Sequence, residues 1–317
     1  WPLEAREQPK RLIVFEIIGG SYPRGQGVQD IAPSNFTLED GWQAIIDWKL
    51  SVLVDSLGDG AFDWWGHNIC GYWRDHDYYW NQVDDPAPMI FDQLRFAREL
   101  YPSLADFTAL RNFADSHDIK LYGYIGQPRS YVRNGTPCGM PFDTNWEHGD
   151  LDAFDTYYAE FVENGFIGIG HDASVHNPAD SPWLLNMVPE LKSRGIDIFV
   201  ESLPKRVNPH LLGYNVVAEH KVWESFRRYP EIFYTEDEIR EAGGRRLYMM
   251  TWPFNQAPGD SDYDPDFNVH DWRFNTTKEL LLAGETVLCP LYGLHWRGYP
   301  LEELVAAAQQ TANVVIE

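Results

Sequence analysis

Two neighbouring segments of this 317-residue chain each run from an apolar, β-branched stretch into an acidic residue and then into a helical pattern. The first reads Gly-Phe-Ile-Gly-Ile-Gly-His-Asp at 165–172, and the second reads Ile-Asp-Ile-Phe-Val-Glu at 196–201. A short apolar run followed by an amphipathic helix is typical of a βα unit, and successive βα units build a parallel sheet. We therefore expect Asp172 and Glu201 at the carboxyl ends of successive parallel strands.

The same alternation extends over the whole chain. Eight runs rich in Val, Ile, Leu and Tyr are predicted to be strands: Arg11–Ile18, Ser51–Leu57, Lys120–Ile125, Phe166–Gly170, Ile196–Val200, Asn215–Ala218, Arg246–Thr251 and Thr286–Cys289. Helices are expected at Leu38–Lys49, Leu104–His117, Leu151–Asn164, Trp183–Arg194, Thr277–Ala283 and Leu301–Thr311. Gly165 and Gly195 stand where helices end, as a left-handed helix cap requires.

Eight βα units in about 300 residues predict an α/β protein that forms a (β/α)₈ TIM barrel. No low-complexity linker divides the sequence, so residues 1–317 are expected to form a single barrel domain. A doubly wound sheet is the alternative. It is disfavoured because no expected strand is followed by a Gly-x-Gly-x-x-Gly loop; Gly165, Gly168 and Gly170 precede or lie within a strand instead.

A long loop rich in aromatic residues is predicted after the second strand, from Gly58 to about Ile90. Eight of the nineteen residues in Phe62–Trp80 are aromatic. Loops on this side of a barrel surround the active site, and indole rings stack on sugar rings, so Trp64, Trp65 and Trp73 are candidate substrate-binding residues. The alternative is a small core formed by the loop itself.

The carboxylates at the strand ends predict the chemistry. A barrel enzyme that cuts a glycosidic bond uses two acids, one that attacks or stabilises C1 and one that supplies a proton. Asp172 and Glu201 are the expected pair, on one rim and about 5 to 6 Å apart if the enzyme retains configuration. Other polar or aromatic residues are expected on the same rim: Asp55, His171, Glu219, His220, Trp252, His295 and Trp296.

The segment Asp-Ala-Ser-Val-His at 172–176 resembles the strand-four motif of the α-amylase superfamily of retaining glycoside hydrolases. The resemblance implies that Asp172 is the nucleophile, that His176 lies near the substrate, and that Glu201 is the general acid/base. The sequence departs from that family at Gly170, where an arginine is expected, and in the motifs after the third and seventh strands. Some other retaining barrels carry the second acid on strand six, so a pairing of Asp172 with Glu219 remains open.

Charge restricts the partners of this chain. There are 25 Lys and Arg against 48 Asp and Glu, which gives a formal net charge of −23. Such a charge repels nucleic acid and anionic membrane surfaces, and no apolar run approaches the ~20 residues of a membrane span. A carbohydrate ligand is compatible with it. The acidity is equally explained as an adaptation for solubility.

No cofactor is required by the expected reaction, but one segment could bind calcium. Asp260, Asp262 and Asp264 alternate in an acidic run, and carboxylates are the ligands that Ca²⁺ prefers. A solvated acidic loop is the alternative. The three cysteines, Cys70, Cys138 and Cys289, are far apart and exclude a disulfide framework.

A second functional class is consistent with the same residues. The chain would then be a barrel without catalysis that binds carbohydrate or builds a larger surface or virion assembly, having lost the signatures missing after strands three and seven. The sequence starts at Trp1 without a signal peptide, which suggests a processed or excised form. An extracellular or surface-exposed location is expected in either case.

Overall fold

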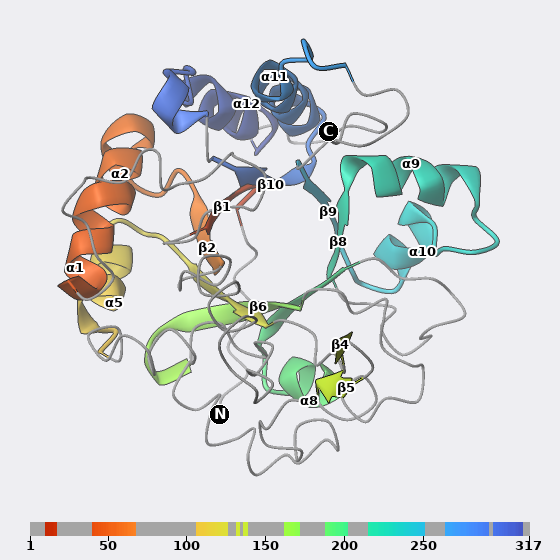
Figure 1. Ribbon diagram of the computed structural model, residues 1–317, viewed down its shortest axis with the longest axis horizontal. Coiled ribbons are helices and arrows are strands. Elements are labelled where there is room, and N and C mark those ends of the chain that lie inside the picture. The colour runs from red at the N-terminus through yellow and green to blue at the C-terminus, as the bar shows by residue number, and fades with distance from the viewer. Residues whose placement is uncertain are drawn as a thin grey trace.

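A closed barrel of parallel strands forms the centre of the computed structural model (Figure 1). The structure describes residues 10–17, 40–67, 106–125, 131–133, 136–138, 162–171, 188–201, 215–250, 264–291 and 294–312. Within these ranges the barrel order is β1-β10-β9-β8-β7-β6-β3-β2, and β4 pairs with β5 in a separate antiparallel ladder. The strands are β1 (Leu12–Ile17), β2 (Asp63–His67), β3 (Leu121–Ile125), β4 (Tyr131–Arg133), β5 (Thr136–Cys138), β6 (Phe166–His171), β7 (Asp197–Glu201), β8 (Asn215–Glu219), β9 (Arg246–Met249) and β10 (Thr286–Pro290). The predicted (β/α)₈ barrel is confirmed.

Helices surround the barrel, with α1, α2 and α5 on one side, α11 and α12 next to β10, and α9 and α10 outside β8 and β9 (Figure 1). Their bounds are α1 (Gly41–Ile45), the π-helix η3 (Ile46–Leu50), α2 (Ser51–Leu57), α5 (Thr108–Ser116), α8 (Val188–Ser193), α9 (His220–Arg228), α10 (Glu236–Glu241), α11 (Val269–Leu282), the short 3₁₀ helix η8 (His295–Arg297) and α12 (Glu302–Ala312). The division of the chain into one domain stays a prediction.

The second strand was predicted wrongly. Ser51–Leu57 is helix α2, which continues α1 and η3 without a break. Its alternation of Val and Leu suggested a strand, but Leu53 is buried whereas Val52 and Asp55 are exposed, because one face of the helix packs on the barrel. The true second strand is β2, whose sequence is Asp-Trp-Trp-Gly-His.

This correction also changes the predicted aromatic loop. Residues 63–67 pair with β1 and β3 inside the barrel sheet, so they do not belong to a loop over the mouth. Trp64 and Trp65 are therefore residues of a strand, and both are buried. Residues 68–90 of the expected loop lie outside the described residues.

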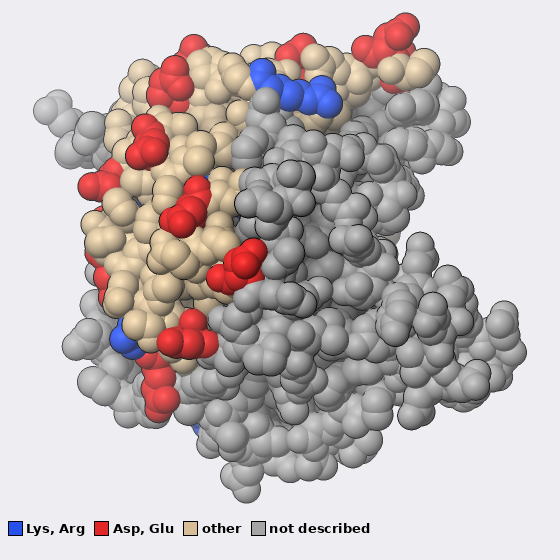
Figure 2. Space-filling view, turned by 60° about the vertical axis from the view of Figure 1, so that its left-hand side comes forward, with Lys and Arg blue, Asp and Glu red and all other residues tan. Residues whose placement is uncertain are grey.

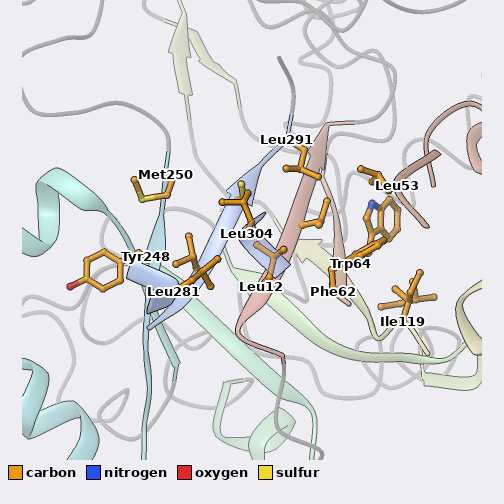
Figure 3. Close-up of a cluster of buried hydrophobic side chains, with 14 of the residues drawn as sticks. Leu12, Leu53, Phe62, Trp64, Ile119, Tyr248, Met250, Leu281, Leu291 and Leu304 are labelled. Carbon is orange, nitrogen blue, oxygen red and sulfur yellow. The ribbon is translucent and has the colours of Figure 1, made fainter. Parts of the chain in front are cut away.

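The main hydrophobic core lies between the barrel wall and the helices. It contains the outward-facing residues of the strands, such as Leu12 and Trp64, together with helix residues such as Leu53, Leu281 and Leu304. Figure 3 shows Leu53 of α2 and Trp64 of β2 on the same side of the strands. Burial of such side chains contributes about 1.5–3 kcal/mol each, so this outer core holds the helices against the barrel.

Polar side chains close the amino end of the barrel. The carboxylate of Asp63 accepts hydrogen bonds from the backbone N–H groups of Lys10 (2.8 Å) and Lys120 (3.1 Å), which joins the starts of three adjacent strands. Burial raises the pKa of Asp63, and these hydrogen bonds oppose that effect. Across the barrel, Asn215 donates to Asp197 at 2.6 Å. Acids at this end are thus used for structure.

Two helix ends agree with their sequence signals. Gly165 and Gly195 have φ of +86° and +79°, and their N–H groups donate to the carbonyls of Val162 and Lys192. Both glycines therefore reverse the chain direction into β6 and β7. By contrast, the helix expected at Thr277–Ala283 begins earlier, at Val269, because the side chain of Asn268 caps it by accepting from two backbone N–H groups.

Helix α11 buries three polar side chains. His270 is 4% exposed, and Arg273 and Thr277 are fully buried on the same face of the helix. Desolvation, helped by the positive charges of Arg297 and Arg273 and opposed by Asp271, lowers the pKa of His270 to about 4. The folded protein therefore keeps this histidine neutral where an unfolded chain would protonate it.

His270 is expected to make the protein sensitive to mild acid. Its pKa is about 4 when folded and about 6.5 when unfolded, so only the unfolded chain takes up the proton as the pH falls between these values. The free energy of unfolding should fall over this range by about 3 kcal/mol from this group. Denaturant titrations of the wild type and His270→Gln at several pH values measure the effect. Identical pH dependence of the two proteins would contradict it.

Candidate functional site

The interior of the barrel is filled by an aromatic layer. Alternate strand residues point inward, and the large ones are Phe15 of β1, Trp65 of β2, Tyr122 of β3 and Phe199 of β7. The ring of Trp65 lies edge-on to Phe15 (centroids 5.1 Å apart) and to Phe199 (6.0 Å), and Tyr122 lies 4.8 Å from Phe199. We call these four residues the aromatic layer. It closes the barrel below its carboxyl rim.

Two glycines of β6 make room for this layer. A Cβ atom on Gly168 would lie 2.6 Å from ring atoms of Tyr122, and one on Gly170 would lie 1.8 Å from Cζ2 of Trp65. No side chain fits at either position without moving a buried ring. At Gly170 the ring of Trp65 occupies the space that any side chain would need.

The strand ends above the layer carry acids. Glu201 is the last residue of β7, two positions after Phe199, and Glu219 is the last residue of β8, two positions after the inward-facing Val217. Glu201 pairs with Val217 in the ladder. A strand spacing of about 4.8 Å and a rise of about 3.3 Å per residue then put the two Cα atoms roughly 8 Å apart.

The pairing of β6 with β7 also relates Glu201 to the segment that precedes Asp172. His171, the last residue of β6, pairs with Val200, which directly precedes Glu201. Asp172 directly follows His171 in the sequence but lies outside the described residues. The structure thus places Glu201, Glu219 and His171 at one rim of the barrel by their backbones.

Three of the predicted site residues have a different place from the one expected. Asp55 is exposed on helix α2, so the prediction that it ends a strand at the mouth is wrong. Trp64 faces the outer core beneath the helices and contributes nothing to the mouth. Trp65 faces inward but is only 5% exposed, as part of the aromatic layer rather than of a loop over the site.

Residues after the last strand stay near the rim. His295 and Trp296 begin the 3₁₀ helix η8, five to six residues beyond the end of β10.

His220 directly follows Glu219 as the first residue of α9, where its ring lies 5.8 Å from Trp272 and 6.1 Å from Tyr248. Desolvation lowers the pKa of His220. The remaining candidates, Trp73, His176 and Trp252, lie outside the described residues.

The predicted calcium segment is described only in part. Asp264 is exposed, and its Oδ1 accepts a hydrogen bond from the backbone N–H of Asp266 at 2.9 Å. Asp260 and Asp262 lie outside the described residues. Among the side chains that the structure describes, no group of three or more His, Cys, Asp or Glu could hold a metal ion.

Sequence reasoning missed the aromatic layer and the strand-end histidine of β2. His67 is the last residue of β2, two positions after Trp65, and pairs with Ile17 of β1. A detectable signal existed, because the alternate glycines at 168 and 170 leave space that a large residue of a neighbouring strand must fill. Because residues 63–67 do not have the composition of a typical strand, the sequence alone does not identify Trp65 as the residue that fills this space.

One face of the molecule carries mostly acidic groups among its described charged side chains. Figure 2 shows Asp and Glu side chains spread over the described residues of this face, with few Lys and Arg among them. In the part of the chain that the structure describes, no helix is long and apolar enough to cross a membrane.

Comparisons with known proteins relate the chain to other barrels only distantly. No protein-family model matches it, and no curated protein sequence matches it significantly. Among solved structures, the gamma-CGTase from alkalophilic Bacillus clarkii is similar, with a TM-score of 0.43 and 13% identity over 87% of this chain. The chain spans about half (49%) of that protein.

A D-psicose 3-epimerase, whose structure was determined in the presence of D-fructose, is also similar. Its TM-score is 0.29, with 13% identity over 66% of this chain and 81% of the epimerase.

Gly170→Ala is expected to destabilise the protein by about 3 kcal/mol or more, since overpacking a well-filled core typically costs about 1–3 kcal/mol and this methyl group would overlap a ring held on several sides. Denaturant unfolding measures the loss. Gly243→Ala is the control, because its Cβ would meet nothing within 4 Å, although its φ of +83° adds some strain. A smaller loss at Gly170 than at Gly243 would contradict the described packing.

Proposed function

We propose that the protein is a glycoside hydrolase of the retaining type, with Asp172 as nucleophile and Glu201 as general acid/base. The observation that carries this proposal is the pairing of His171 with Val200 at the carboxyl rim of a closed barrel. These are the residues directly before the two acids. The proposal continues the ladder by one residue, which would put the Cα atoms of Asp172 and Glu201 about 5 Å apart.

The aromatic layer supports this assignment. Glu201 stands two positions after Phe199, and Asp172 stands two positions after Gly170, whose missing side chain is replaced by the ring of Trp65. If the alternation of each strand continues, both acids would be the first inward-facing residues beyond the layer. A proton donor must hold its proton near neutral pH, and a place at the boundary of an apolar layer favours the protonated form of a carboxyl group.

Glu219 is the alternative proton donor. It ends the next strand, and its Cα is roughly 8 Å from that of Glu201 by strand geometry. A third acid so close would also favour the protonated form of Glu201 by repulsion between like charges.

The substrate we propose is an oligo- or polysaccharide, and the mechanism needs no cofactor. Calcium at Asp260, Asp262 and Asp264 would have a structural role. An extracellular or surface-exposed setting, alone or within a larger assembly, is part of the same proposal.

A barrel that binds carbohydrate without cleaving it is the second candidate. It is favoured by Gly170, because the indole of Trp65 occupies the space that an arginine before the nucleophile would need. A protein that binds glycans in calorimetry but releases no reducing ends on prolonged incubation would have this function.

Substitution of the acids separates their roles. Asp172→Asn should lower turnover of every substrate by roughly 10⁴-fold or more, because no leaving group can replace the attack on C1. Glu201→Gln should lose about 10²–10⁴-fold on natural glycans, keep the first step on aryl glycosides with good leaving groups, and regain turnover with azide. Steady-state assays of purified variants measure this. If Glu219→Gln shows the azide rescue and Glu201→Gln is fully active, the acid/base belongs on β8.

The stereochemistry of the product gives an independent test. A double displacement retains the anomeric configuration, so the first sugar released should have the same configuration as the substrate. Proton NMR in the first minutes of hydrolysis distinguishes the two anomers before mutarotation. First release of the opposite anomer would show an inverting enzyme and rule out Asp172 as a nucleophile.

A further inference from the structure

The two neighbouring tryptophans of β2 have matched environments on opposite faces of the strand. Trp64 is fully buried in the outer core, and its ring folds over Gly66, where a Cβ would lie 2.5 Å from Cη2 of Trp64. Trp65 is 5% exposed in the aromatic layer, and its ring lies against Gly170, where a Cβ would lie 1.8 Å from Cζ2. Each indole thus depends on one glycine, and the glycine at Trp65 belongs to β6, the strand that precedes Asp172 in the sequence.

The contacts of Trp65 join the strands on which the acids stand. Its ring covers the backbone of β6 at Gly170 and meets the edge of Phe199 in β7, and Gly170 itself pairs with Phe199 in the ladder. These two residues lie two positions before Asp172 and Glu201. No other side chain separates the indole from the backbone of Gly170, so movement of one must be followed by movement of the other.

We propose that Trp65 is a positioning residue, which sets the distance and depth of the acids at 172 and 201 by holding the ends of β6 and β7 from inside the barrel. The expected effect of Trp65 on turnover rests on the proposed function. The expected effect of Trp65 on the ends of β6 and β7 is independent of that function. Trp65 does not touch the substrate in this account. It also fixes how deep a sugar can enter, because the aromatic layer fills the barrel below the rim.

The packing step is tested by a double-mutant cycle that needs no activity. Trp65→Phe replaces the indole by a smaller ring and so removes the part that holds Cζ2, Cε2 and Cη2, the atoms nearest to the missing Cβ of Gly170. Gly170→Ala should therefore destabilise the wild type strongly but be tolerated in the Trp65→Phe background, with a midpoint close to that of Trp65→Phe alone. Additive losses in the denaturant midpoint would show that the two residues are not in contact.

The positioning step is tested with Trp65→Phe and Trp64→Phe as a matched pair. Both remove the same atoms from β2, and both should lower the melting temperature. Only Trp65→Phe should lower kcat, by at least about tenfold with KM changed less than about threefold, because a displacement of about 1 Å in a catalytic group can cost about 10²-fold. The alkaline limb of the pH profile, which reports the ionisation of the proton donor, should move in the same variant.

A measurement without turnover separates this inference from the proposed function. Carbon-13 NMR of labelled glutamate side chains, with Glu201 assigned from Glu201→Gln, follows the ionisation of that carboxyl group directly. Trp65→Phe should move its titration midpoint by about half a pH unit or more, and Trp64→Phe should not. A shift in the protein that hydrolyses no glycan would support positioning and reject the hydrolase. An unchanged midpoint, or equal changes in the two variants, would overturn the inference whatever the activity.

Discussion

The contact between Trp65 and Gly170 determines how the centre of this barrel is built. A parallel barrel of eight strands must fill its interior with side chains, and here four aromatic rings do so together with smaller residues such as Val217, Leu247 and Leu288. Such rings fit only because β6 offers no side chain at Gly168 and Gly170. The alternate glycines of β6 and the filled interior of the barrel are therefore two consequences of the same packing of rings.

The two ends of the barrel differ in how their acidic residues are placed. At the amino end, Asp63, Asp197 and Asn215 satisfy backbone and side-chain groups and hold the strand starts together. At the carboxyl end, Glu201 and Glu219 finish adjacent strands beyond the aromatic layer. The described acids at the amino end thus have structural partners, and those at the carboxyl end are the ones that we propose carry out the chemistry. Buried charges without partners are costly, so the proposed site depends on this boundary.

The fold was largely predictable from the sequence because most strands have the apolar, β-branched composition of buried parallel strands. Seven of the eight expected strands overlap the observed ones, and the helix stops at Gly165 and Gly195 follow from their backbone conformation. The failure at Ser51–Leu57 has a physical reason. Its β-branched residues lie on an amphipathic helix held by Leu53, whereas β2 consists of an acid, two tryptophans, a glycine and a histidine. Burial of Trp64 and Trp65 on opposite faces outweighs the low strand propensity of their neighbours.

Of the candidate site, the sequence predicted only those residues that directly end a correctly identified strand. Glu201 and Glu219 end strands as expected, but Asp55 does not, because its assignment depended on the wrong strand. The place of Trp65 could not be read from local sequence, since its partner Gly170 lies on β6, two strands away in the barrel order.

A crystal structure would test the central claim most directly through the distance between the carboxyl groups of Asp172 and Glu201. We predict about 5–5.5 Å on one rim, above the ring of Trp65, as retaining enzymes require. A separation beyond about 10 Å, or carboxyl groups at opposite ends of the barrel, would contradict the account.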